Sequence, residues 1–222
     1  MTEAVGSMIG VRLRTPRAAA VAGILFGVLL GASFALIRFS IPADPADNGA
    51  WISKRHDVVA FALALVPFAG IAFLWFIGVV RDRLGDLEDR FFATVFLGSG
   101  LLFLAMTFVA SALAGGMLAT YSADPTRVLS GDLYAFGRAV MYRITNVYAI
   151  KMAAVFMISL ATIWVRTRTM PRVLAIATYG LAVLLLVSIS YSLWVVEIFP
   201  IWVLSVSLYI LIGNFRRSTP IA

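Results

Sequence analysis

The sequence of 222 residues contains no cysteine and only one histidine, His56. Without cysteine the chain cannot form disulfides, iron–sulfur clusters, thiolate zinc sites or a thiol nucleophile. A single imidazole also excludes a bis-histidine haem or a multi-histidine metal centre within one chain. Phosphate-binding loops and the HExxH and GxSxG motifs are absent as well. We therefore expect no metal, no cofactor and no catalytic residues.

Charge is also scarce, because only 13% of the residues are charged while 62% are hydrophobic and the mean hydropathy is +0.97. A soluble domain has about 25% charged residues. This composition excludes a water-soluble globular fold and predicts an integral membrane protein. The net charge of +7 does not indicate nucleic-acid binding, because the basic residues lie between apolar runs, as they do in membrane proteins.

The apolar runs predict an all-α fold, a transmembrane bundle of about six spans forming one membrane domain over residues 1–222. A spanning helix needs about 20 apolar residues. The expected spans are 18–37, 58–80, 91–115, 146–165, 173–192 and 199–215. The fourth is weak, because its uncharged stretch, 152–165, has only 14 residues and must borrow others upstream.

The distribution of basic residues predicts that the N and C termini are both cytoplasmic. With this orientation, 11 Lys and Arg residues face the cytoplasm and seven lie on the opposite side. This excess follows the positive-inside rule.

Residues 133–146 have the pattern of an amphipathic helix. The pattern permits an interfacial helix on the outer surface, or simply the solvated beginning of the fourth span. Polar and apolar residues fall on opposite arcs, with Arg138, Tyr142, Arg143 and Asn146 on one and Phe136, Val140, Ile144 and Val147 on the other.

The first span carries three glycines at four-residue spacing: Gly23, Gly27 and Gly31. Such a stripe lets another helix approach closely, and close approach drives helix association in lipid. The stripe predicts a packing face, either for a partner protein or for another span of the same chain.

Lys151 and Glu197 are expected at similar depth in the outer leaflet, where they could form an ion pair or reach water separately. The loop between the second and third spans is a second charged feature. It is either a self-paired solvated turn or a cytoplasmic contact for a partner. Its charged residues are Arg81, Asp82, Arg83, Asp86, Glu88, Asp89 and Arg90.

The stretch 75–100, WFIGVVRDRLGDLEDRFFATVFLGSG, resembles a recurrent block in uncharacterised multi-pass membrane proteins of actinobacteria. That family has no assigned activity. The resemblance implies a multi-pass protein of the bacterial cytoplasmic membrane.

These features favour a non-enzymatic accessory or assembly subunit that packs against other membrane proteins, such as a transporter complex. Its other partner is the lipid bilayer. One alternative is a small transporter or channel for an apolar or weakly polar solute, with its path between the second, third and fourth spans. A further alternative is a lipid-modifying enzyme using Lys54, Arg55, His56 and Asp57, with His56 as general base.

Overall fold

The computed structural model describes residues 16–42, 51–84, 90–124, 132–188 and 194–217, and every regular element in these ranges is helical. The predicted all-α fold is therefore confirmed. A π-helical segment, η2 (Ile144–Ala149), and a 3₁₀ turn, η3 (Val195–Glu197), accompany the α-helices. The α-helices are α1 (Pro16–Ser40), α2 (Trp51–Leu84), α3 (Arg90–Ala123), α5 (Asp132–Arg143), α6 (Ile150–Thr167), α7 (Arg172–Val187) and α8 (Ile198–Arg217).

Five helical segments of the described chain are long and apolar enough to cross a bilayer, which makes this a multi-pass membrane protein. They are Ala18–Ser40, Trp51–Arg81, Phe91–Ala123, Leu133–Thr167 and Val195–Ile212.

The sixth expected span, 173–192, coincides with α7, which has only 16 residues. A helix of that length rises about 24 Å, less than the roughly 30 Å of hydrocarbon. It ends because Ser188 adopts an extended backbone, with φ −62° and ψ 114°. Within the described residues, five segments therefore have full spanning length, and α7 is a shorter apolar helix in the place of the sixth expected span.

The fourth span is one continuous helical segment of 35 residues, Leu133–Thr167. Arg143 and Ile150, which flank η2, both keep right-handed helical backbone angles. The segment 133–146 is therefore in line with the fourth span, as the solvated beginning of that span would be.

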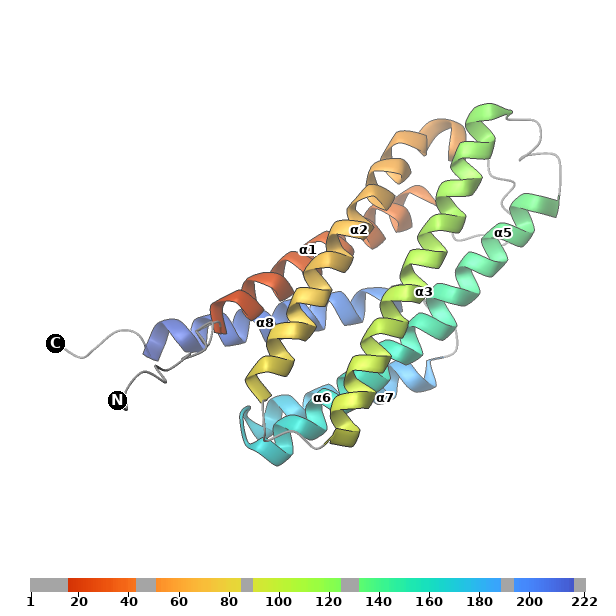
Figure 1. Ribbon diagram of the computed structural model, residues 1–222. Coiled ribbons are helices and arrows are strands. Elements are labelled where there is room, and N and C mark those ends of the chain that lie inside the picture. Colours follow the sequence, from red (N-terminus) through yellow and green to blue (C-terminus); the bar gives the residue numbers. More distant parts are fainter. Residues whose placement is uncertain (1–15, 43–50, 85–89, 125–131, 189–193, 218–222) are drawn as a thin grey trace, which may run out of the picture.

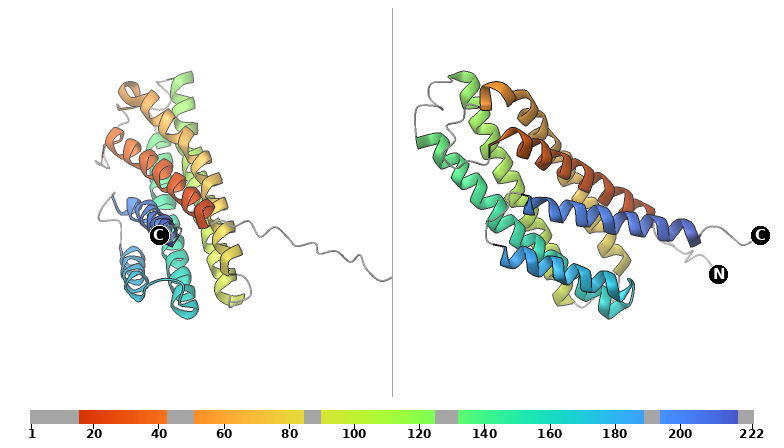
Figure 2. Two further views of the ribbon diagram at one scale, coloured as in Figure 1. Left: turned by 90° about the vertical axis from the view of Figure 1, so that its left-hand side faces the viewer. Right: turned by 180° about the vertical axis from the view of Figure 1, so that it is seen from behind.

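With α5, η2 and α6 counted as one segment, successive helices run in opposite directions, so α1 begins and α8 ends at the same end of the bundle (Figure 1). Helix α1 packs against α2 and α8, and α6 packs against α3 and α7 (Figure 2). We call the end where α1 begins proximal and the opposite end distal. The predicted topology makes the distal end the outer one.

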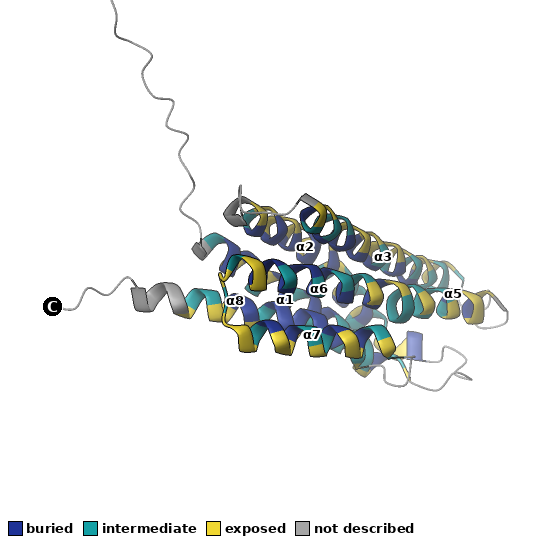
Figure 3. Ribbon diagram, turned by 90° about the horizontal axis from the view of Figure 1, so that it is seen from below, coloured by how far each residue is buried: buried dark blue, intermediate teal, exposed yellow. Residues whose placement is uncertain are grey.

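An aromatic cluster fills the centre of the bundle. The ring of Phe73 lies 4.5 Å from Phe26, 5.7 Å from Phe103, 5.4 Å from Phe156 and 5.8 Å from Phe199, measured between centroids. These residues come from α2, α1, α3, α6 and α8, so five helices share one core. Figure 3 shows the buried residues on the inward faces of the helices.

Candidate functional site: an apolar groove in the distal headpiece

Helices α2 and α3 and the continuous segment formed by α5, η2 and α6 are longer than a bilayer requires. About 20 residues cross the hydrocarbon. Counted from the proximal positions Arg81, Phe91 and Arg166, they end near Phe61, Ser111 and Asn146. The rest of these helices projects distally by about 15–20 Å when the helices follow the membrane normal. We call the projecting parts, residues 51–60, 112–123 and 132–143, the distal headpiece.

The headpiece has its own small core, in which Trp51, Ile52 and Val59 of α2 meet Leu118 of α3 and Tyr134 of α5. The indole N–H of Trp51 donates a hydrogen bond of 2.8 Å to the buried hydroxyl of Tyr134. This bond links α2 to α5 across 83 positions of sequence.

Two further contacts hold the headpiece, one to the chain just after α1 and one within the headpiece. The guanidinium of Arg138 donates to the carbonyl of Pro42, just after α1, at 2.9 Å. The imidazole Nε2 of His56 lies 3.0 Å from the hydroxyl of Ser122, which joins α2 to α3. The headpiece is therefore a built element, fixed by polar contacts on three sides.

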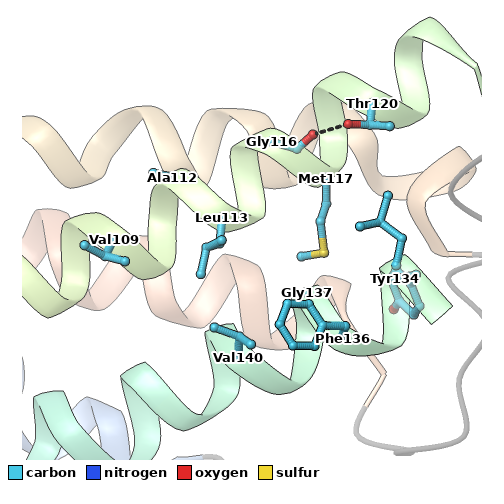
Figure 4. A pocket seen from close by; sticks show the side chains of 11 residues that line it. Val109, Ala112, Leu113, Gly116, Met117, Thr120, Tyr134, Phe136, Gly137 and Val140 are labelled. Atoms are coloured by element: carbon cyan, nitrogen blue, oxygen red, sulfur yellow. Dashed lines mark hydrogen bonds between the residues drawn. The ribbon is translucent and has the colours of Figure 1, made fainter.

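An apolar groove with a volume of about 480 Å³ opens between α3 and α5 at this level (Figure 4). It is lined by Val109, Ala112, Leu113, Gly116, Met117, Thr120, Leu133, Tyr134, Phe136, Gly137 and Val140.

Small residues create the groove. A Cβ at Gly116 would meet nothing within 4 Å, so this part of α3 leaves open space beside it. On α5, a Cβ at Gly137 would lie 2.7 Å from the sulfur of Met117. Figure 4 shows Met117 reaching from α3 toward Gly137. Met117 therefore forms the floor, and substituting either glycine would fill or distort the groove.

The polar groups that line the groove already have partners. The Thr120 hydroxyl donates to the carbonyl of Gly116 at 2.9 Å, and the Tyr134 hydroxyl accepts from Trp51. The rim is apolar, with Phe136 68% and Leu133 56% exposed. The groove therefore offers shape and apolar area rather than hydrogen bonds.

The glycine stripe of α1 is covered by α8 of the same chain. A Cβ at Gly27 would lie 2.7 Å from Cβ of Leu204 and 2.8 Å from the carbonyl oxygen of Pro200. A Cβ at Gly23 would collide with the hydroxyl of Ser207. The stripe is thus a packing face for another span of the same chain, which is one of the two interpretations that its spacing allowed.

Lys151 and Glu197 do not pair. Lys151 is exposed on α6, whereas Glu197 is 9% exposed in η3, and no ion pair joins them within the described residues. Glu197 is the third residue of the apolar segment Val195–Ile212.

The charged loop lies mostly outside the described residues. Arg81 is exposed near the end of α2. Asp86, Glu88 and Asp89 fall in the undescribed range 85–89. Asp82 and Arg83 belong to the end of α2 and Arg90 begins α3, but their side chains are not described. Both interpretations of the loop therefore stay predictions.

The structure adds a serine to the His56–Asp57 pair that the sequence indicated. His56 Nδ1 lies 3.2 Å from the carboxylate of Asp57, and its Nε2 faces Ser122. Serine, histidine and aspartate contact one another in this order in a hydrolytic triad. A triad also needs hydrogen-bond donors that stabilise the oxyanion of the reaction intermediate. Ser122 lies inside α3, where the N–H groups are committed to the helix. Ser122 also donates to Leu118, and Asp57 is fully exposed. This cluster is suited to joining α2 and α3.

Within the described ranges, no three His, Asp or Glu side chains gather as a metal site would require. Comparisons with protein-family models, with curated proteins and with solved structures find no match to this chain. The family suggested by residues 75–100 is therefore not identified. The sequence and the structure together show a multi-pass helical membrane protein in contact with a lipid bilayer.

Proposed function

We propose that this protein is a non-enzymatic subunit of a membrane assembly, and that the groove between α3 and α5 receives an apolar helix of another integral membrane protein. The assembly resides in the cytoplasmic membrane of a bacterium, as the resemblance of residues 75–100 suggests. The groove's partner approaches at or just beyond the distal membrane surface.

The observation that carries this proposal is the position of the groove. Apolar side chains facing hydrocarbon need no partner, because lipid covers them. When the helices follow the membrane normal, most of the residues that line the groove, at 109–120 and 133–140, fall beyond the 20 or so residues that cross the hydrocarbon. A soluble surface rarely leaves such an apolar hollow uncovered, so a partner protein is the expected cover.

The lining also favours a helix as the partner. Ala112 and Gly116 are four residues apart on α3, and both are exposed. Small residues at this spacing allow close backbone approach between helices. Because the polar groups of the lining are already satisfied, a partner gains by burying apolar area and loses no hydrogen bond.

The alternatives receive less support. The path of a transporter was expected between the second, third and fourth spans, but Phe73, Phe96 and Phe156 occupy the space between these helices. The lipid-modifying enzyme lacks oxyanion donors at Ser122.

The test is purification of the tagged chain from its native membrane in mild detergent, followed by mass spectrometry of the intact assembly. We expect a foreign membrane protein at fixed stoichiometry. Gly116→Leu places its Cβ in open space and extends into the groove, so it should remove that partner. Gly180→Leu is the matched control, because Gly180 is also exposed, on α7, and also has nothing within 4 Å of its Cβ position.

Loss of the partner from the Gly116→Leu protein alone supports the proposal. A wild-type protein that purifies only as a monomer or homo-oligomer contradicts it. A partner retained by the Gly116→Leu protein shows that the groove is not the contact.

A further inference from the structure

Glu197 is the most costly charged group in the described bundle. It precedes α8 directly and is buried between α1 and α8, with its Oε2 3.5 Å from the Cβ position of Gly31. Its other oxygen, Oε1, is buried and has no hydrogen-bond partner. Ionisable groups within a membrane span nearly always pair with another group, and an unpaired buried charge costs several kcal/mol in general.

A basic side chain that also has a buried nitrogen without a hydrogen-bond partner lies on the same face of α1 as Gly31. The Nε of Arg38 is buried and also has no partner. Among the described residues, its guanidinium contacts the carbonyl of Ile41, through a long bond of 3.3 Å from Nη1, and the Trp194 ring, whose centroid is 6.0 Å from Cζ.

Trp194 lies between the two charged groups. Its ring contacts Arg38, while its carbonyl accepts a 3.0 Å hydrogen bond from the backbone N–H of Glu197. One short turn of chain, 194–197, therefore touches both the base and the acid.

Helix geometry brings Arg38 within reach. Gly31 and Arg38 are seven residues apart, which is about two turns, so they share one face of α1 at a spacing of about 10.5 Å. Side chains of a helix lean toward its N-terminus. For Arg38 that direction leads toward Gly31 and hence toward Glu197, away from the Ile41 carbonyl.

We propose that Arg38, and not Lys151, is the counter-ion of Glu197, and that the pair forms when Arg38 leaves the Ile41 carbonyl and turns along α1. The ion pair fastens the distal end of α1 to the start of α8. It satisfies both unpartnered groups at once and closes the distal end of the interface that the glycine stripe opens. Lys151 stays exposed on α6.

The test is a double-mutant cycle on the full chain in lipid nanodiscs, read as the midpoint of thermal unfolding. The variants are Arg38→Gln, Glu197→Gln and the double variant, with Lys151→Gln as the control. We expect Arg38→Gln to lower the midpoint, because it leaves Glu197 without its counter-ion. The double variant should lose less than the sum of the two single losses, and Lys151→Gln should add independently to Glu197→Gln.

Charge exchange keeps the proposal testable even where a single variant fails to fold. Arg38→Glu should reduce the yield of monodisperse protein, and combining it with Glu197→Arg should restore the yield. Additive midpoints for Arg38 and Glu197, together with no recovery on charge exchange, would overturn the proposal. Coupling between Lys151 and Glu197 would overturn it as well. Neither result bears on the groove, which lies on α3 and α5.

Discussion

Gly27→Ala should destabilise the bundle, although it adds a single methyl group. That methyl would lie 2.7 Å from Cβ of Leu204 and 2.8 Å from the carbonyl oxygen of Pro200. Both atoms belong to or adjoin the backbone of α8, so no side-chain rotation can make room. The two helices must move apart over the contact.

The magnitude follows from two opposing terms. Overpacking of a tight interface costs about 1–3 kcal/mol. Alanine has a higher helix propensity than glycine by about 1 kcal/mol, which offsets part of that cost. The net loss should be up to about 2 kcal/mol. For a chain of this size each kcal/mol lowers the unfolding midpoint by about 2–4 °C.

Gly31→Ala supplies the control within the same stripe. Its methyl would lie 3.5 Å from Oε2 of Glu197 and 4.0 Å from Cβ of Pro200, which are ordinary contact distances. This variant should match or exceed the wild-type midpoint. Thermal unfolding of purified protein in detergent, followed by size-exclusion chromatography of the soluble fraction, measures both variants.

Equal shifts for the two variants would refute this reasoning, because they would show that α8 does not determine the spacing. A stripe used only by a partner protein would leave both midpoints unchanged in the isolated chain.

Two other predictions concern the headpiece and the topology. Trp51→Phe removes the hydrogen bond to the Tyr134 hydroxyl and should lower the stability of the headpiece by about 0.5–1.5 kcal/mol. Amide hydrogen exchange should then become faster at the start of α2 and α5 than in the spans, and unchanged exchange would show that this bond does not hold the headpiece. The chain has no cysteine, so Lys54→Cys should react with an impermeant maleimide on intact cells, whereas Arg168→Cys should react only after permeabilisation. The reverse pattern would place both termini on the outer side.

Sequence reasoning located the spans where hydropathy alone decides. The first three expected spans lie within α1, α2 and α3, because long uncharged runs flanked by arginine leave little choice. It failed for α7, because hydropathy cannot show where a helix stops inside an apolar run. The serine-rich stretch 188–192 was the available signal, and the helix does end at Val187.

The predicted Lys151–Glu197 ion pair failed because the sequence gives the depth of a residue in the membrane but not the side of the bundle that its side chain faces. Counting residues from the end of a span gives depth, and it placed both groups in one leaflet. It says nothing about the direction in which each side chain leaves the bundle axis. That direction depends on which helices pack together, and here α8 packs on α1, which turns Glu197 toward Gly31 and leaves Lys151 exposed. The same information was missing for the glycine stripe, whose spacing indicated close packing but not the identity of the second helix.

The groove was beyond sequence reasoning for a related reason. The third span was expected to end near residue 115 because a bilayer needs no more, yet α3 continues to Ala123 and α5 rises beside it. Helices that exceed the hydrocarbon thickness must either tilt or project. In this bundle the Trp51–Tyr134 bond joins the surplus of α2 to α5. Where the surplus projects, an apolar helix face leaves the lipid, and the proposed partner protein would cover it. The length of the helices, rather than any catalytic residue, is therefore the feature that argues most directly for a partner.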